Sequence, residues 1–508
     1  MVNFAQLEDK RQIIQAKLDS LKTQKERNIM GQFSTPIALA NDILQHTAKL
    51  RLENTKISFL DPAFGTGVFF SALNNIFPSS YIETATGYEI DQHYGKLTRE
   101  LWAETNLNYK LIDFTQAVSP TDDRDKFNLI VCNPPYVRHH HLKGKKEYLQ
   151  IEALKTANVK ISGLAGLYCY FIALAHGWMK VDGLATWLIP SEFMDVNYGQ
   201  AIKDYLLNQV TLLQIHRFDP NNIQFHDVLV SSAIIWFRNK KPNPKHQVKF
   251  TFGNKIATPL YEKEISIEIL ARETKWTRFP IFSQRFAEKK SKLGDFFTIK
   301  RGIATGDNQF FILSPEQMEQ WNLPRECFRP ILPSPRYLDE TEIYADDKGN
   351  PKIKQQLFVL DCKLPIDELK QRYPSLYIYL LEGIKRGVAQ RYLCKSRKIW
   401  YSQENRLESR FYCTYMGRSD KKGKNPFRFI LNYSKAIVSN SYLILYPKPN
   451  LEKKIETHPI LCHQIIKVLA RITGKTMIDE GRVYGGGMHK LEPKELSKVL
   501  VRDLKDLL

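Results

Sequence analysis

Between residues 57 and 238 the sequence alternates between short apolar runs and segments with helical periodicity. The candidate strands read ISFLD, TATGYE, YKLIDF, NLIVC and LATWLIP. Strands that alternate with helices are typical of a parallel sheet with helices packed on its faces. Two later runs, VTLLQIHRF and VLVSSAIIWFR, lie close enough in the chain to form an antiparallel pair at the edge of that sheet. The alternation therefore predicts an α/β fold.

The domain organisation follows from length and from a change of pattern. A chain of 508 residues is too long for one hydrophobic core, so at least two domains are expected. Residues 5–28 read as one charged amphipathic helix, and a second charged helix is expected at residues 490–508. From about Lys292 the sequence becomes irregular and rich in glycine, aromatic and basic residues. We expect one domain at 1–288 and a second, of α+β type, at 289–508.

Charge and cysteine usage narrow the class of protein. The formal net charge of +20 favours a polyanionic partner, most often nucleic acid, although a generally basic protein is the alternative. The seven cysteines include no Cys-x-x-Cys pair, which is the usage of a reducing cytosol. The charged start of the chain is unlike a signal peptide, and the apolar segment GLYCYFIALAHGWM is too short to span a bilayer. A cytoplasmic protein without a membrane partner is expected.

Three consecutive strand ends carry groups suited to adenosine. In FLDPAFGTGVFFSAL, a strand, a turn and a helix follow one another, and Gly65 and Gly67 let the backbone approach a ligand closely. Glu89 follows the next strand and can accept hydrogen bonds from both ribose hydroxyls. Asp113 can accept from an adenine amino group, and Phe114 can pack against the ring. A plain tight turn and a surface acid are the alternatives for the first two motifs.

Five motifs in order, GQFSTP, DPAFGTG, GYEID, LIDF and NPPY, resemble the gamma-class DNA amino-methyltransferases. These are the TaqI-like and Eco57I-like enzymes that methylate adenine N6 in restriction-modification systems. The resemblance covers most of residues 28–240. It implies a Rossmann-like, S-adenosylmethionine-dependent methyltransferase domain with that cofactor in the adenosine pocket. The cofactor-binding residues are then Thr35, Pro36, Asp61, Ala63, Gly65, Gly67, Glu89, Asp113 and Phe114.

The Asn-Pro-Pro-Tyr motif carries the chemistry. An exocyclic amine on a base is a poor nucleophile because its lone pair is conjugated with the ring. The side-chain carbonyl of Asn133 and the backbone carbonyl of Pro134 can accept from that amine and stabilise the positive charge that develops during transfer. The fixed φ of the prolines keeps the second acceptor in place, and Tyr136 offers a face for base stacking. A simple strand-ending turn is the alternative.

The target base must leave the duplex to reach this motif, so base flipping is implied. In the family, a second aromatic residue sandwiches the flipped adenine just before an antiparallel strand pair. Phe225 matches that position, with Phe218 as the rival. The run RHHH at 138–141 does not indicate a metal site, because adjacent histidines in a strand point to alternate sides and no further ligand follows at a suitable spacing. We expect it to touch phosphates or cap the site.

The second half of the chain carries candidate DNA contacts. The stretches LGDFFTIKRGIATGDNQFFIL, IVSNSYLILYP and GGGMHKLEPKEL resemble, more loosely, the target-recognition domain of the same family. Lys and Arg interleave with aromatic residues in KRGVAQRYLCKSRKIWY and RSDKKGKNPFRF, a pattern that suits a groove for phosphates and bases. A solvated basic face is the alternative. The candidate residues are Arg301, Lys395, Arg397, Lys398, Lys421, Lys422, Lys424 and Arg428.

The expected function is site-specific methyl transfer to N6 of a flipped-out adenine in double-stranded DNA. Such an enzyme would protect host DNA from a separate companion endonuclease with which it forms no stable complex, although a solitary methyltransferase fits the same residues. Cytosine-N4 methylation stays an alternative, but Ser-Pro-Pro-Tyr is commoner there and Asn133 favours adenine. Methylation of RNA or of protein glutamine is a second alternative. A DNA-binding module with an inactive fold is a third, against which the intact acceptor set argues.

Overall fold

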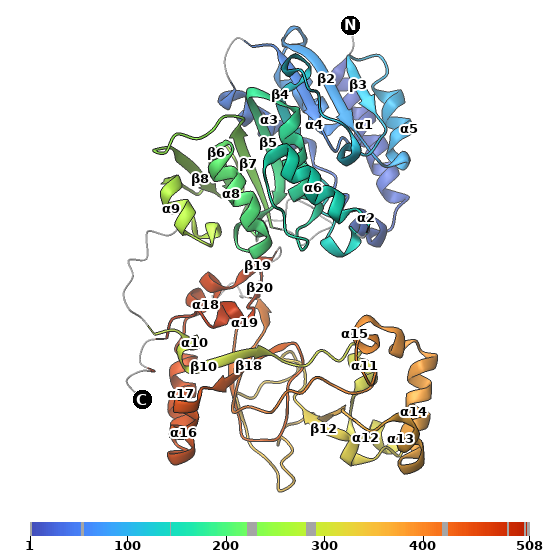
Figure 1. Cartoon of the computed structure of the whole chain (residues 1–508), viewed down its shortest axis with the longest axis vertical. Helices are drawn as coiled ribbons and strands as arrows, with labels where there is room; N and C mark the ends of the chain where they lie inside the picture. Colours follow the sequence, from blue (N-terminus) through green and yellow to red (C-terminus); the bar gives the residue numbers. More distant parts are fainter. Residues whose placement is uncertain are drawn as a thin grey trace. The chain divides into compact units, whose positions relative to one another are not determined.

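The chain divides into two compact units, Met1–Arg285 with Tyr484–Gly486 and Phe286–Val483 with Gly487–Leu508. Figure 1 draws both, coloured along the sequence. The structure is a computed structural model, and it describes residues 3–51, 55–142, 144–220, 231–280, 291–418, 425–484, 487–501 and 504.

Within the described residues, the first unit is built on a nine-stranded sheet in the order β3-β2-β1-β4-β5-β7-β6-β8-β9. The five strands from β3 to β5 run parallel to one another, whereas β7 pairs antiparallel with both β5 and β6. The α/β fold and the antiparallel pairing of the two later strands are therefore confirmed. Their expected place at the edge of the sheet is wrong, because β8 pairs with β6 and β9 continues the sheet beyond it. The strands are β1 (Ile57–Asp61), β2 (Ile82–Tyr88), β3 (Leu107–Lys110), β4 (Phe127–Cys132), β5 (Met179–Pro190), β6 (Thr211–Arg217), β7 (Ser232–Arg238), β8 (Gln247–Phe252) and β9 (Tyr261–Ser266).

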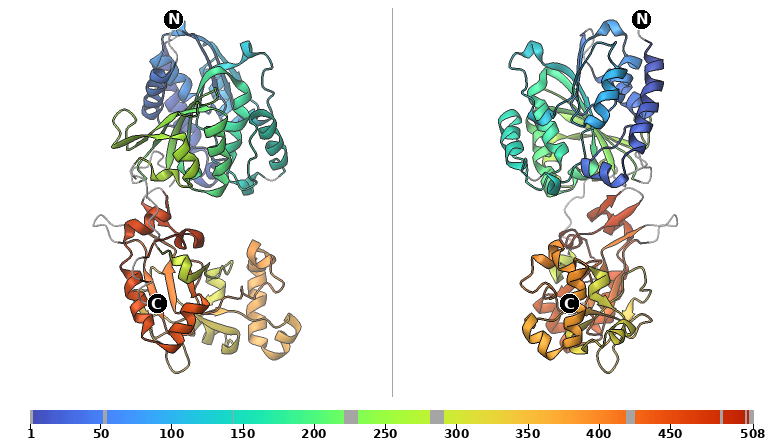
Figure 2. Two further views of the ribbon diagram at one scale, coloured as in Figure 1. Left: turned by 60° about the vertical axis from the view of Figure 1, so that its left-hand side comes forward. Right: turned by 90° about the vertical axis from the view of Figure 1, so that its right-hand side faces the viewer.

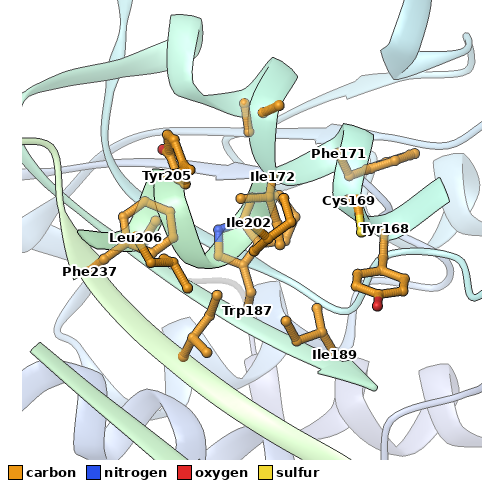
Figure 3. Packing of buried hydrophobic residues seen from close by; sticks show 14 of the residues in the cluster. Tyr168, Cys169, Phe171, Ile172, Trp187, Ile189, Ile202, Tyr205, Leu206 and Phe237 are labelled. Carbon is orange, nitrogen blue, oxygen red and sulfur yellow. The ribbon is translucent and has the colours of Figure 1, made fainter. Parts of the chain in front are cut away.

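Helices cover both faces of this sheet, as the two views in Figure 2 show. Successive residues of β4 consequently enter different cores: Leu129 packs in one cluster and Ile130 in the other. Figure 3 shows the second cluster, where Ile172 and Trp187 pack with Ile202. After two helices at the N-terminus, the helices of this unit are α3 (Ile37–Leu50), α4 (Val68–Ile76), α5 (Gln92–Leu101), α6 (Lys146–Ala157), α7 (Leu167–Ala175), α8 (Gln200–Asn208) and α9 (Ile267–Arg272).

The N-terminal segment forms two helices, α1 (Phe4–Ser20) and α2 (Gln24–Met30), so the single helix expected over residues 5–28 is wrong. The break has a local cause. Thr23 caps α2 by accepting from the backbone of Glu26, whose carboxylate accepts in return from the Thr23 backbone at 2.8 Å. This reciprocal capping box starts a new helix at that point.

Two loops differ from the sequence expectation. The strand expected to run through LIDF ends at Lys110, because Asp113 caps a short 3₁₀ turn by accepting from the Thr115 backbone at 2.9 Å. The three histidines at His139–His141 also form a 3₁₀ turn rather than a strand, so they do not alternate between two faces.

The second unit has the expected α+β character. Its largest sheet has the order β10-β18-β15-β17-β13. Helices α16 (Pro449–Thr457) and α17 (Leu461–Ala470) pack against that sheet through Leu451 and Ile465. Smaller sheets have the orders β11-β14-β12 and β16-β20-β19. The strands are β10 (Phe297–Arg301), β11 (Ile312–Leu313), β12 (Phe328–Ile331), β13 (Glu342–Ile343), β14 (Leu357–Leu360), β15 (Phe411–Thr414), β16 (Met416–Arg418), β17 (Phe429–Asn432), β18 (Tyr442–Pro447), β19 (Arg482–Tyr484) and β20 (Met488–Lys490).

The helices of this unit are short, and none of the described residues forms a helix long and apolar enough to cross a membrane. The long helix expected at 490–508 is wrong in its first part, where β20 ends and only α19 (Pro493–Leu496) follows. The other helices are α10 (Leu293–Phe296), α11 (Asn308–Phe311), α12 (Pro315–Gln320), α13 (Ile366–Arg372), α14 (Pro374–Lys385), α15 (Tyr392–Lys395), α16 (Pro449–Thr457), α17 (Leu461–Ala470) and α18 (Gly474–Glu480).

Candidate active site

The carboxyl ends of three neighbouring parallel strands, β2, β1 and β4, carry the polar residues of the candidate site. Asp61 is the last residue of β1, Glu89 follows β2, and Asn133 follows β4. Ligands of parallel α/β sheets bind at this edge. The topology therefore brings three of the residues singled out from the sequence to one edge of one sheet.

The turn after β1 uses its two glycines differently. Gly65 has φ +56°, and a Cβ added there would meet nothing within 4 Å. Gly67 has φ +91°, and a Cβ there would lie 2.6 Å from the ring of Phe64. Gly65 thus leaves its side of the turn open to a ligand. Gly67 is required by packing beneath the turn, a role that the sequence analysis did not foresee.

Glu89 holds this turn against the next strand. Its Oε2 accepts from the Gly65 backbone at 2.9 Å and its Oε1 from the Asp91 backbone at 2.7 Å. Burial raises the pKa of Glu89, and these two backbone hydrogen bonds partly oppose that shift. A carboxylate offers about four acceptor positions, so capacity remains for two ribose hydroxyls. Ile90, which follows directly, keeps 50% of its side chain exposed and is a candidate apolar contact that the sequence analysis missed.

Asp61 is buried at the end of β1. Its Oδ1 accepts from the Ala63 backbone at 3.1 Å, whereas Oδ2 has no hydrogen-bond partner among the described residues. Burial raises the pKa of Asp61 to about 7, although hydrogen bonds from Ala63 and the Cys132 thiol oppose this. Burial also raises the pKa of Cys132 well above 9, so this residue stays a neutral thiol at physiological pH. Burial thus brings the pKa of Asp61 close to neutrality.

The side-chain amide of Asn133 has a defined orientation. Its Nδ2 donates to the Phe33 carbonyl at 3.1 Å and to the Thr35 hydroxyl at 3.0 Å. Its Oδ1 is buried and has no hydrogen-bond partner within the described part of the chain. An unpaired buried acceptor costs about 1–3 kcal/mol, so its retention points to a role in binding or chemistry. The acceptor predicted for the target amine is therefore both oriented and unused.

The segment GQFSTP is locked to the NPPY loop. The Tyr136 backbone donates to the Gly31 carbonyl at 3.0 Å, and a Cβ on Gly31 would lie 2.4 Å from the Tyr136 nitrogen. The Tyr136 hydroxyl donates to the Leu188 carbonyl at 3.2 Å, and its ring lies 5.6 Å from that of Phe33. Gly31 has φ +64° and ends α2, so it is a positioning residue that the sequence analysis missed. A glycine directly after the last residue of a helix was the available signal.

The remaining residues of the two motifs lie beside these groups in the chain. Thr35 and Pro134 are buried, whereas Pro36 is exposed and occupies the position before the first turn of α3. Ala63 is half-buried, and only its backbone enters a hydrogen bond with Asp61. Pro134 is thus held in place by packing, as an acceptor on a fixed backbone requires.

Asp113 and Phe114 have partners of their own. One oxygen of Asp113 accepts from the Thr115 hydroxyl at 2.7 Å, and the other pairs with Lys145 Nζ at 3.0 Å. The ring of Phe114 is 3% exposed and packs 5.5 Å from that of Phe171. In this arrangement Phe114 belongs to the core, and its contact with an adenine ring stays a prediction.

The second stacking residue is not described by the structure. Phe225 lies in residues 221–230, outside the described part of the chain. The rival, Phe218, is 2% exposed and its ring lies 4.8 Å from that of His216 in the core of the first unit. Burial leaves Phe218 no free face, so it gains no support as a stacking residue.

Three of the predicted DNA-contacting cations are exposed. Lys395 and Lys398 have exposed side chains at the end of α15 and just beyond it. Arg301 is also exposed, with its guanidinium 4.1 Å from the centre of the Tyr415 ring and its Nε donating to the Asn440 carbonyl at 3.1 Å. These three remain available to an anionic ligand on at least one side.

Two other predicted contacts hold loops together instead. Arg428 donates to the carbonyls of Pro335 and Leu338, both at 2.7 Å, and Arg397 donates to the Ala304 carbonyl at 2.6 Å. Both side chains are half-buried. Their interleaving with aromatic residues was therefore a signal of packing as much as of DNA contact. Lys421, Lys422 and Lys424 lie in residues 419–424, outside the described part of the chain.

Two family models match this chain, one in each half. Residues 42–224 match the family model described as Eco57I restriction-modification methylase. Residues 280–507 match that of the Type II methyltransferase M.Eco57I, C-terminal domain. The first match contains the Asp61, Glu89 and Asn133 strand ends, and the second covers nearly all of the second unit.

Relatives and a solved structure extend the likeness to both units. Type II methyltransferase M.AccI of Acinetobacter calcoaceticus is 25% identical over 501 residues, which cover 94% of this chain and 86% of that protein. M.XamI of Xanthomonas campestris pv. amaranthicola is 23% identical over 486 residues, with the same coverage. The fold is similar to that of the Type IIL restriction-modification enzyme MmeI in complex with DNA, with a TM-score of 0.57, 14% identity and coverage of 97% of this chain and 69% of that one. The chain therefore belongs to the Eco57I-like methyltransferases of restriction-modification systems.

Proposed function

We propose that this methyltransferase transfers a methyl group from S-adenosylmethionine to N6 of an adenine that is flipped out of double-stranded DNA. The observation that carries the proposal is the state of Asn133. Its amide nitrogen is bound to Thr35 and Phe33, and its buried carbonyl oxygen is unpaired among the described residues. An acceptor in that state suits a donor that arrives with the substrate, and an exocyclic amine is such a donor.

The site residues fit the cofactor. Open space beside Gly65, the spare acceptor positions of Glu89 and the exposed side chain of Ile90 suit an adenosine. The unpaired Oδ2 of Asp61 suits a cationic or N–H group of the methionine part. S-adenosylmethionine supplies the electrophilic methyl group. The chain supplies the binding groups and an oriented acceptor for the amine that is to be methylated.

During transfer the amine of the base gains positive charge, so acceptors aimed at its N–H bonds stabilise the transition state more than the ground state. Asn133 Oδ1 provides one acceptor and the backbone carbonyl of Pro134 the other. The ring of Tyr136 is held by its hydroxyl bond to Leu188, and it supports stacking of the base beside these acceptors. In this proposal Phe225 stacks on the opposite face of the base.

The two parts of the chain divide the work in this proposal. Residues 1–288 form the catalytic domain, and residues 289–508 form a domain that recognises the DNA target. The net charge of +20 and the exposed cations Arg301, Lys395 and Lys398 support contact with phosphates. The family's setting supports a separate companion endonuclease that cuts the same sequence and forms no stable complex with this chain.

The test is incorporation of label from tritiated S-adenosylmethionine into unmethylated plasmid DNA, followed by digestion to nucleosides and chromatography. Label in N6-methyldeoxyadenosine is the expected result. Label in N4-methyldeoxycytidine would keep the fold and the acceptor geometry but overturn the base. Label in neither would overturn the DNA substrate and direct the assay to RNA and protein glutamine. Plasmids of different sequence would then locate the methylated site.

A further inference from the structure

A side chain of the N-terminal helix connects two segments of the candidate cofactor site. Gln15 of α1 accepts from the Thr66 hydroxyl at 2.6 Å, and its Nε2 donates to the Ser34 hydroxyl at 2.9 Å. Thr66 stands between the two glycines of the turn after β1, and Ser34 stands beside Thr35 in the segment that orients Asn133. One amide therefore spans the glycine turn and the FSTP segment.

The same turn is held by a buried ion pair one helical turn earlier. Arg11 forms two hydrogen bonds of 2.7 Å with the carboxylate of Glu8, and its third nitrogen donates to the Thr66 hydroxyl at 3.0 Å. The side chains of Arg11 and Glu8 are 4% and 9% exposed. Arg11 is buried, and two of its nitrogens are bound to Glu8. The hydrogen bond from its third nitrogen therefore fixes the position of the Thr66 hydroxyl.

The end of α1 extends the contacts to α5, the helix that follows Glu89. Asp19 accepts from Gln15 at 2.8 Å, from Ser34 at 2.7 Å and from the Tyr94 hydroxyl at 2.8 Å. The ring of His93 bonds to the Leu18 carbonyl at 2.9 Å. Tyr94 and His93 belong to α5, whose start follows Glu89 by three residues. Helix α1, which packs against α4 and α5 (Figure 1), thus contacts the FSTP segment, the glycine turn and the helix that follows Glu89.

We propose that α1 is a brace for the cofactor site and that Gln15 is its positioning residue. The inference rests on the proposed function and deepens it. A helix outside the five motifs contributes to the affinity for S-adenosylmethionine by holding two of the cofactor-binding segments in place. Gln15 both donates and accepts, so it sets the separation of the glycine turn from the FSTP segment. The cofactor must fit between those two segments, and loss of the bridge lets them move apart before it binds.

The test compares cofactor binding and turnover in the full chain and its variants. Calorimetric titration with S-adenosylmethionine is expected to give a Kd about tenfold higher for Gln15→Leu than for wild type, which corresponds to the loss of about 1.4 kcal/mol of binding free energy. The rate constant at saturating cofactor and the Kd for DNA are expected to stay within about twofold of the wild-type values. Neither quantity depends on how the two segments are held before the cofactor binds. Gln6→Leu, at an exposed position of the same helix, is the matched control and should bind as wild type does.

Three further variants separate positioning from a general structural role. Gln15→Glu keeps the acceptor for Thr66 but loses the donor and faces Asp19, so it should bind cofactor as weakly as Gln15→Leu. Adding Asp19→Asn returns a donor to the pair and should restore much of the affinity, which a merely structural role would not predict. Ser34→Ala removes the other end of the bridge at an exposed position and should weaken binding if Gln15→Leu does not fold.

The outcomes are distinguishable. A wild-type chain that binds S-adenosylmethionine, together with Gln15→Leu and Ser34→Ala Kd values within twofold of it, would overturn the brace and leave the proposed function intact. A wild-type chain that does not bind S-adenosylmethionine would overturn the proposed function and the brace together. A raised Kd that is reversed by the double variant supports both.

Discussion

The amide nitrogen of Asn133 donates to the hydroxyl of Thr35 over 3.0 Å, across 98 residues of sequence. The Phe33 carbonyl takes the second N–H of the same amide. With both donors fixed, the carbonyl oxygen can point in only one direction, and that oxygen has no partner in the described chain. The first of the five motifs thus orients the last, NPPY, and this contact predicts that a threonine outside the NPPY loop affects the reaction.

Thr35→Val should therefore lower the rate of methyl transfer about tenfold at saturating cofactor, because the Asn133 amide loses one of two orienting acceptors. Thr35→Ser keeps the hydroxyl and is the matched control, expected within about threefold of wild type. Single-turnover assays with excess enzyme measure the step directly. Equal rates for the valine and serine variants would show that the hydroxyl does not orient the amide.

Asp61 gives the folded chain a characteristic pH dependence. Its ordinary pKa of 3.8 is raised by burial to about 7, so the folded state binds a proton in a range where the unfolded state has lost it. The stability contributed by protonated Asp61 is present below about pH 4 and is lost as pH rises through 7. The free energy of unfolding of wild type, relative to Asp61→Asn, should decrease between about pH 4 and about pH 7 and level off at higher pH. Denaturant titrations at several pH values measure it, and parallel curves for the two proteins would contradict the assignment.

The ion pair of Glu8 and Arg11 should contribute to stability far more than an exposed pair of the same chemistry. Glu8→Leu leaves a buried guanidinium without its carboxylate and is expected to cost about 3 kcal/mol of unfolding free energy. Arg272 pairs with Glu268 on α9, where the side chains are 79% and 70% exposed, so Arg272→Ala should cost less than about 1 kcal/mol. Similar losses for the two variants would mean that the Glu8 pair is not desolvated.

Lys395 and Lys398, the exposed lysines at the end of α15 and just beyond it, should govern the salt dependence of DNA binding. Each phosphate contact contributes about −0.9 to the slope of log K against log salt, so Lys395→Ala/Lys398→Ala should reduce the slope by about 1.8. Arg428→Ala is the contrasting variant. Its guanidinium binds the carbonyls of Pro335 and Leu338, so its loss should lower stability and leave the slope unchanged. A slope that is insensitive to the two lysines would remove them from the DNA contacts.

Local patterns predicted the strands well because each strand end is marked within a few residues. The apolar run before Asp61, the run before Glu89 and the run before Asn133 all end where the structure ends β1, β2 and β4, or within one residue. These positions meet at one edge because parallel strands share a direction. The topology of the sheet therefore brings residues that are marked separately in the sequence together in one site.

Local sequence patterns missed contacts that are distant in the chain or that compete with periodicity. Gln15 reads as one more polar residue on a charged helix, yet its partners lie 51 and 19 residues away. Arg428 sits in a basic stretch whose charge suggested DNA, but its hydrogen bonds reach about 90 residues back in the chain. The strand predicted through LIDF ends early because Asp113 accepts a hydrogen bond from the Thr115 backbone and caps a short turn there. Pairings of this kind are visible only once the chain is folded.

The most direct test of the account is the single-turnover rate of Asn133→Ala on unmethylated DNA with tritiated S-adenosylmethionine. The variant should bind DNA and cofactor with Kd values close to wild type, while methyl transfer falls by a factor of about 10²–10³, because an acceptor aimed at the developing charge is lost. A rate within about threefold of wild type, with label still in N6-methyldeoxyadenosine, would contradict the role given to the unpaired oxygen of Asn133.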